Sequence, residues 1–119
     1  RRQRQMCIRD RFVLRDASGA AVGDIGLRIS GKNPHEADVG YALLPDAQGK
    51  GYASEALKAI CDYGFQQLGV HAINAWVLGS NAGSSRLLEK HGFIRIQVLE
   101  KAYHLNGIDY DDWVYRLER

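Results

Sequence analysis

Long hydrophobic runs are absent from this sequence of 119 residues, and cysteine is scarce. No apolar stretch approaches the roughly 20 residues that a membrane-spanning helix needs, so we expect no membrane partner. Two cysteines, Cys7 and Cys61, are too few for a disulfide framework. Cys61 falls on the apolar face of a predicted helix, so we expect it to be a reduced, buried core residue in a cytoplasmic protein. His35, His71 and His91 have no metal-ligand spacing with one another or with the cysteines, so no metal is expected.

The net charge of +2 conceals an uneven distribution. Residues 1–15 carry six arginines and one aspartate, a charge of +5, whereas residues 16–119 carry a charge of −3. A short arginine run with no apolar segment is typical of a disordered or non-native extension and not of a signal peptide. We interpret residues 1–11 as such a basic tail and residues 12–119 as one domain. Binding of nucleic acid by the tail is the weaker alternative.

Strand and helix patterns follow one another in the order β-β-β-α-β-α-β-β, which predicts a mixed α/β (α+β) fold. A helical spacing of small and apolar residues over 53–68, ended by Gly69, predicts the first helix. A shorter helix follows Asn81 and ends at Gly92, and Asn106-Gly107 marks the turn of a hairpin. The expected strands cover residues 12–16, 21–29, 35–44, 71–78, 93–103 and 110–119. Residues 71–78, rich in Ile, Val and Trp, are expected to be buried on both faces.

A glycine loop, Gln48-Gly49-Lys50-Gly51, leads from the third strand into the first helix. The first N–H groups of a helix are unpaired and lie at the positive end of its dipole, so such a loop favours a phosphate or pyrophosphate. The loop lacks the Gly-Lys-Ser/Thr ending of nucleotide hydrolases, and Ser54 stands where the dinucleotide fingerprint needs glycine. By spacing alone, a turn that merely connects strand to helix is an equal alternative.

Two blocks of sequence resemble the GCN5-related N-acetyltransferase superfamily. The first is Gln48-Gly-Lys-Gly-Tyr-Ala53, preceded by Ala37-Asp-Val-Gly-Tyr41. The second, Asn81-Ala-Gly-Ser-Ser-Arg-Leu-Leu-Glu-Lys-His-Gly-Phe93, is similar to a block of the branch that acetylates the N-termini of ribosomal proteins. The resemblance covers roughly residues 12–119. It implies a mostly antiparallel twisted sheet and the transfer of an acetyl group from acetyl-CoA to a primary amine by direct attack.

One departure from the superfamily concerns the start of the domain. The strand and the one or two helices that normally precede the first meander strand, and that help to wall the substrate pocket, have no counterpart here. The resemblance therefore implies an N-terminally truncated fold. Three explanations are open: the sequence is a fragment, residues 1–11 replace the native N-terminus, or a partner chain completes the fold. A homodimer is one possible assembly.

The resemblance also implies where acetyl-CoA binds. Its pyrophosphate would lie on the backbone N–H groups of Gly49 to Ala53, and its pantetheine arm would run along the strand ending at Leu44. A backbone N–H near Leu43 would stabilise the tetrahedral oxyanion, and Asn81 would contact the pantetheine. The expected cofactor-binding residues are Leu43, Leu44, Gln48, Gly49, Lys50, Gly51, Tyr52, Ala53, Ser54, Asn81 and Ser84.

Ser84 is the expected acid that protonates the departing thiolate. The wider superfamily often places a tyrosine acid seven residues after the asparagine, but that position is Leu88 here. The alternative is purely structural: Asn81 as the N-cap of a helix, bonded to the backbone N–H of Ser84, would account for both residues without any catalytic role. Tyr41 would line the amine pocket, although an aromatic residue on a strand is commonly a core residue.

Asp38 is the first candidate for the general base, because it matches a strand position that carries a glutamate base in the histone-acetylating branch. A solvent-facing strand residue is the alternative. The glutamate base of the ribosomal branch aligns with Tyr103, so that base is missing, and Tyr103, His104 and Glu100 are further candidates. The acceptor is either a protein N-terminal α-amino group or a small amine. A non-catalytic acyl-CoA-binding module is the rival function.

Overall fold

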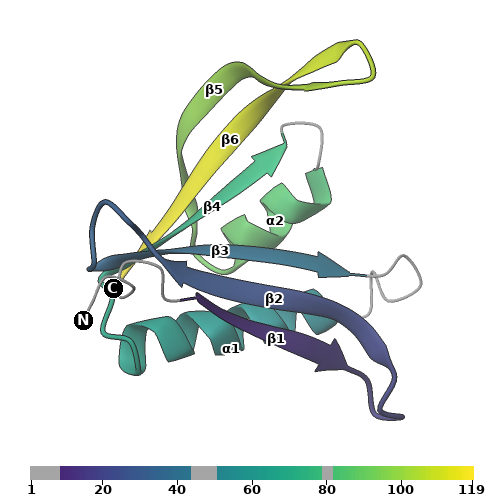
Figure 1. Cartoon of the computed structure of the whole chain (residues 1–119), viewed down its shortest axis with the longest axis vertical. Helices are drawn as coiled ribbons and strands as arrows, with labels where there is room; N and C mark the ends of the chain where they lie inside the picture. Colours follow the sequence, from purple (N-terminus) through teal and green to yellow (C-terminus); the bar gives the residue numbers. More distant parts are fainter. Residues whose placement is uncertain (1–8, 44–50, 79–81) are drawn as a thin grey trace.

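The computed structural model describes residues 9–43, 51–78 and 82–119, which form one six-stranded sheet and two helices in the predicted order (Figure 1). The mixed α/β class is therefore confirmed. The elements are β1 (Arg9–Arg15), β2 (Ala21–Ile29), β3 (Glu36–Leu43), α1 (Tyr52–Gln66), β4 (Ala72–Leu78), α2 (Ala82–Lys90), β5 (Ile94–Leu105) and β6 (Ile108–Glu118).

The first strand begins three residues before its predicted start at Phe12. Residues 9–11 are all charged, but the backbone pairing with β2 extends back to Arg9, which lies opposite Arg28. Strand β1 is the edge of the sheet, where charged side chains are tolerated. Arg11 forms an ion pair with Asp24 of β2 at 3.1 Å. Residues 9–11 therefore belong to the sheet.

The strands lie in the order β1-β2-β3-β4-β6-β5, and neighbouring strands are antiparallel except at one junction. Strands β3 and β4 are parallel. A parallel pair needs a crossover connection, and α1 makes it. The mostly antiparallel sheet implied by the resemblance is confirmed, and its single parallel junction lies at the centre.

Helix α1 covers one face of β1 to β3 (Figure 1). Its buried residues, Leu57, Ile60, Cys61 and Gly64, follow the predicted helical spacing. They pack in one core cluster with β2 side chains that include Leu27. Burial raises the pKa of the Cys61 thiol to about 12, so this cysteine is an inert core residue, as predicted.

The second half of the sheet consists of β4 and the β5–β6 hairpin. The hairpin turns at Asn106 and Gly107, with φ values of 52° and 79°. Positive φ at both positions is typical of a type I′ turn, for which Asn-Gly is the preferred pair. Strand β4 was predicted to be buried on both faces, which is wrong at Trp76: this side chain is 49% exposed where the sheet opens.

Helix α2 packs against this half of the sheet through both polar and apolar contacts. The hydroxyl of Tyr115 on β6 donates a hydrogen bond to Glu89 Oε2 at 3.0 Å. Leu88, one turn beyond Ser84, is fully buried in the core cluster. Within the described residues, neither α1 nor α2 is long and apolar enough to span a membrane.

Three polar residues fasten the parallel junction, and we call them the Glu36 cluster: Glu36 on β3, Asn74 on β4 and Arg116 on β6. Asn74 is buried, and Glu36 and Arg116 are partly buried. Arg116 donates to both oxygens of Glu36, from Nη1 at 2.8 Å and from Nη2 at 3.1 Å. Asn74 Nδ2 donates to Glu36 Oε1 at 3.0 Å. Hydrogen bonds from Arg116 and then Asn74 hold the pKa of Glu36 below its ordinary value of 4.5.

We predict that Arg116→Leu lowers the free energy of unfolding by about 2 kcal/mol, because it leaves the partly buried Glu36 carboxylate without its charged partner. A carboxylate whose pKa is depressed by folding stabilises the protein above its ordinary pKa, and this contribution is lost as the pH falls. Wild-type stability should therefore drop below about pH 4.5, and the drop should be smaller in the variant. Urea unfolding between pH 3 and pH 7 measures both effects.

Arg28→Leu is the matched control. Arg28 pairs with Asp38 of the neighbouring strand through a single hydrogen bond of 3.2 Å, and the Arg28 side chain is 52% exposed although that of Asp38 is 19% exposed. Exposed ion pairs contribute about 0–1 kcal/mol. Equal destabilisation by the two substitutions would contradict a special role for the Glu36 cluster.

Candidate active site

The central strands form a fork. Strands β3 and β4 pair through only three residue pairs, Glu36 to Asp38 with Ala72 to Asn74. Beyond them the two strands diverge (Figure 1). Each strand stays paired on its outer side, with β2 and β6 respectively. In the described chain, the two inner edges past the third pair therefore face a gap without a strand partner.

A cleft of about 210 Å³ fills the gap of this fork. Strands β3 and β4 form two of its walls, and α2 forms the third. The structure brings together Tyr41 and Ser84, two of the residues predicted from the sequence, and places Leu88 beside them. The lining residues are Val39, Gly40, Tyr41, Ala75, Trp76, Val77, Ser84 and Leu88.

Tyr41 contributes a buried hydroxyl to the cleft. Burial raises the pKa of Tyr41, and an interaction with Ser84 offsets part of this rise. The contact with Ser84 falls short of a well-formed hydrogen bond, since the Tyr41 hydroxyl oxygen has no partner of good geometry among the described residues. The phenol therefore stays protonated at neutral pH.

A second hollow, of about 260 Å³, lies on the face of the sheet opposite α1. Side chains alternate between the two faces of a strand, so Asp38 and Tyr41 point to opposite sides of β3. Asp38 lines this second hollow, and its Oδ2 accepts a hydrogen bond from Arg28 Nη2 at 3.2 Å. Val39 and Gly40 line both spaces, so this short segment of β3 is the wall between them.

Gly51, Tyr52, Ala53 and Ser54 form the N-terminus of α1. Gly51 is the N-cap and has a φ of 84°, a conformation that glycine adopts without strain. Because glycine has no side chain, no side-chain hydrogen bond caps the first N–H groups of the helix. Ser54 Oγ is hydrogen-bonded to His91 Nε2 at 2.8 Å, and burial, then Lys90 and Lys58, lower the pKa of His91. His91 is therefore neutral at neutral pH.

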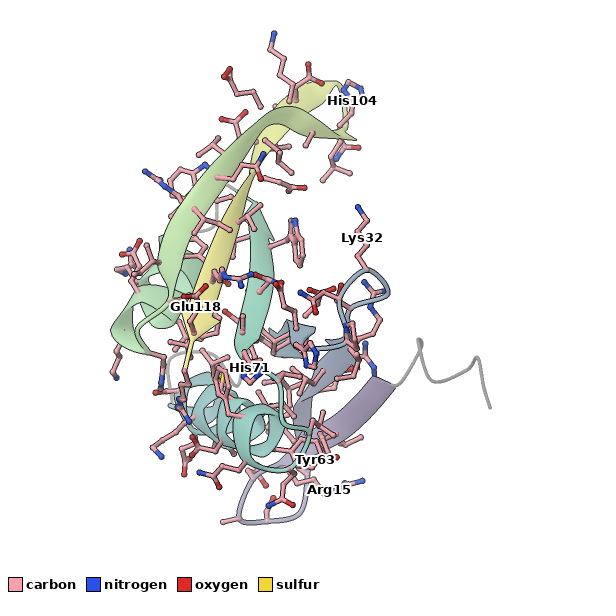
Figure 2. All side chains as sticks on the ribbon, turned by 90° about the vertical axis from the view of Figure 1, so that its left-hand side faces the viewer. Arg15, Lys32, Tyr63, His71, His104 and Glu118 are labelled. Atoms are coloured by element: carbon pink, nitrogen blue, oxygen red, sulfur yellow. The ribbon has the colours of Figure 1, made fainter. Side chains whose placement is uncertain are left out.

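Several predicted site residues lie outside the described residues: Leu44, Gln48, Gly49, Lys50 and Asn81. For Leu43 and Tyr103 only the backbone is described, within β3 and β5. The two further base candidates do not line the cleft. Glu100 is exposed on β5, and His104 pairs with Asp109 at 2.6 Å near the hairpin tip, which Figure 2 shows far from Tyr63 on α1.

Two residues that the sequence analysis did not assign belong to this region. Trp76 lines the cleft from β4, and a tryptophan interrupting an aliphatic strand is the signal that marks it. His91 holds Ser54 in place from the segment after α2. No local pattern could have shown this, because 37 residues separate the two side chains.

The comparisons with known proteins agree with this geometry. The family described as "Acetyltransferase (GNAT) domain" matches residues 2–94. This match covers well over half of the chain, so the chain belongs to the GNAT acetyltransferase family. The resemblance seen in the two sequence blocks is thereby confirmed.

Three similar proteins illustrate the range of the family. The uncharacterized N-acetyltransferase YoaA of Bacillus subtilis is 36% identical over 81% of this chain and 54% of its own length. The putative ribosomal N-acetyltransferase YdaF of the same species is 24% identical over 83% and 54%. A structure of mutant forms of the spermidine/spermine N-acetyltransferase SpeG from Vibrio cholerae matches with a TM-score of 0.84 and 28% identity, over 92% of this chain and 66% of that chain.

The chain spans about half the length of these curated relatives. Their names agree on transfer to an amine nitrogen but differ in the acceptor, which is a polyamine for SpeG and is ribosomal for YdaF. Among the described residues, no three metal-ligating side chains gather into a group.

Proposed function

We propose that this domain is an acetyl-CoA-dependent N-acetyltransferase in which an amine at the fork attacks the acetyl thioester directly. The observation that carries the proposal is the separation of β3 and β4 after three residue pairs, which leaves two strand edges facing one cleft. Backbone N–H and C=O groups on such edges need partners. An extended chain with amide groups can pair with them as an added strand, and the pantetheine arm of acetyl-CoA has this chemistry.

The N-terminus of α1 fits the pyrophosphate of the same molecule. The first helical hydrogen bond runs from the Glu55 N–H to the Gly51 carbonyl at 3.1 Å, so the N–H groups of Tyr52, Ala53 and Ser54 are available at the positive end of the helix dipole. His91 orients the Ser54 hydroxyl beside them. In this proposal Leu43, Leu44, Gln48, Gly49, Lys50 and Asn81 keep the cofactor-binding roles expected from the sequence.

The acceptor amine enters from the hollow on the opposite face of β3. Asp38 lies there and is the proposed base that removes a proton from the amine. Because Arg28 holds its Oδ2, Asp38 acts through its other oxygen or after this ion pair opens. Ser84 lies on the cleft side, where the thiolate departs. In this proposal the acetyl group of acetyl-CoA and the acceptor amine therefore meet beside Val39 and Gly40, which line both spaces.

The acceptor is a primary amine, either a protein N-terminal α-amino group or a small amine such as a polyamine. SpeG supports the small amine and YdaF supports the ribosomal protein, each by its name alone. A non-catalytic acyl-CoA-binding module is the rival, and it shares coenzyme binding but not turnover.

Calorimetric titration with acetyl-CoA tests the proposal, with coenzyme A and ATP as comparisons. We expect micromolar affinity for both coenzymes and none for ATP, because only the coenzymes carry a pantetheine arm. Release of free thiol with spermidine, with a ribosomal-protein N-terminal peptide, or with both would then separate the enzyme from the binding module. A folded chain that binds neither coenzyme would overturn the proposal.

We predict that Gly51→Glu abolishes coenzyme binding, because the new carboxylate lies at the N-terminus of α1 and repels the pyrophosphate. The loss should exceed about 100-fold in Kd, measured by calorimetry, since a like charge replaces an attractive site.

Gly69→Glu is the matched control for backbone strain. Gly69 lies beyond the other end of α1, and its φ of 72° is similar to the 84° of Gly51. An added Cβ meets nothing within 4 Å at either position. The two variants should therefore lose similar stability, whereas Gly69→Glu should bind coenzyme normally. Equal loss of binding in both would contradict the pyrophosphate assignment.

We also predict that Gly40→Val lowers kcat/KM for the acceptor by about tenfold or more, because displacing a reactant by about 1 Å already has a large kinetic cost. Gly40 lies between the two hollows, and a Cβ added there meets nothing within 4 Å. A β-branched residue also suits a strand, so the melting temperature should not fall. Steady-state kinetics at saturating acetyl-CoA and thermal unfolding measure the two effects.

Gly31→Val provides the comparison, because Gly31 also has open space around it but lies in the turn before β3. It should leave kcat/KM unchanged. If Gly40→Val behaved like Gly31→Val, the amine would have to reach the cleft by another route.

A further inference from the structure

Tyr41 has a feature that its assignment to the amine pocket does not explain. Its hydroxyl is buried in the cleft and lacks a hydrogen bond of good geometry among the described residues. Leaving a buried hydroxyl incompletely bonded costs about 1–3 kcal/mol. Phenylalanine would fill the same space without this cost, so the hydroxyl needs a reason to be there.

The reaction proposed above supplies that reason, because the departing thiolate needs a proton donor in the cleft. Among the described lining residues, the side chains with an O–H or N–H group are Tyr41, Trp76 and Ser84. An indole N–H does not ionise in water, and an aliphatic hydroxyl is a far weaker acid than a phenol. Tyr41 is therefore the strongest acid that lines the described cleft.

We propose that Tyr41 donates its proton to the departing thiolate, with Ser84 as the partner that stabilises the phenolate and returns the proton. This inference rests on the proposed acetyl transfer. The amine nitrogen forms a bond to the acetyl carbon, and the carbon–sulfur bond breaks with its electron pair on sulfur. Asp38 takes the first proton of the ammonium group before the attack, and the nitrogen releases a second proton to water on the Asp38 side as the amide forms. Sulfur takes the Tyr41 proton, and a solvent proton returns to Tyr41 through Ser84. No group is oxidised or reduced.

The acidities inside the cleft are compatible with this transfer. A phenol of ordinary pKa near 10 is a weak donor to a thiolate of ordinary pKa near 8.5 in water. Burial, however, raises the pKa of a thiol as well as that of a phenol. The buried thiol of Cys61 in this same core has its pKa raised to about 12. Burial raises the pKa of Tyr41 as well, so a thiolate formed in the cleft is, like the phenolate, a stronger base than in water.

The decisive experiment is the ionisation of coenzyme A bound to wild type and to Tyr41→Phe, followed by the ultraviolet absorbance of the thiolate as the pH rises. An O–H group that donates to sulfur stabilises the thiolate, so the bound thiol should ionise at a pH about one unit higher in Tyr41→Phe. Acetyl transfer in a single turnover should slow by about 100-fold. The affinity for coenzyme A should stay within a few-fold of wild type.

Tyr115→Phe is the control, because it also removes a hydroxyl from a buried tyrosine but one bonded to Glu89 and outside the cleft lining. It should leave the thiol ionisation unchanged. Ser84→Ala is the second variant, and it should raise the pH at which the Tyr41 phenol itself ionises, because the Ser84 interaction lowers the pKa of Tyr41. This readout does not depend on the folding of Tyr41→Phe.

The outcomes separate this inference from the function on which it rests. A wild-type chain that binds no coenzyme overturns the proposed function. A chain that binds and transfers, but whose thiol ionisation and transfer rate do not change in Tyr41→Phe, overturns the role of Tyr41 alone. Equal shifts in Tyr41→Phe and Tyr115→Phe would also overturn it, because they would indicate general loosening of the core.

Discussion

The ion pair between Glu36 and Arg116 lies at the point on which the geometry of the sheet depends. Strand β3 has its long antiparallel partner β2 on one side and only three residue pairs with β4 on the other. A parallel contact this short would hold two half-sheets together poorly if it relied on backbone hydrogen bonds alone. Arg116 reaches from β6 across β4 to Glu36, and Asn74 bonds to both charged groups. The strands can therefore separate immediately beyond the cluster without the halves coming apart.

The fork has two chemical consequences that follow from strand geometry. Its inner edges present backbone groups that can pair with an extended ligand. The alternation of side chains also assigns Asp38 and Tyr41 to opposite faces of β3. A transfer between two substrates requires groups of different function on the two sides of the reacting bond. One strand supplies both, separated only by Val39 and Gly40.

Local patterns in the sequence were sufficient for the elements of the fold. The order of strands and helices, the apolar face of α1 and the Asn106-Gly107 turn were all predicted and are confirmed. These features depend on residues close together in the chain. The cofactor loop was identified by its motif, and most of it lies outside the described residues. Its assignment therefore remains a prediction.

The features that the sequence did not reveal join residues far apart in the chain. Glu36 and Arg116 are 80 positions apart, and Ser54 and His91 are 37 apart. Periodicity cannot place such pairs, because their contact depends on how β3, β4 and β6 are ordered in the sheet and on how α1 and α2 lie against it. Trp76 was predicted to be buried because residues 71–78 are rich in Ile, Val and Trp, but the divergence of β3 leaves its ring beside the open cleft.

The same burial has different consequences for two ionisable side chains of this core. Cys61 is enclosed by α1 and the sheet, and its raised pKa makes it unreactive because no substrate reaches it. Tyr41 is only partly buried, and its buried hydroxyl lines a cleft between the strands. A high pKa there keeps the proton in place until a stronger base forms nearby. The two side chains differ in whether a substrate can reach them, and for Tyr41 this depends on the point at which β3 diverges from β4.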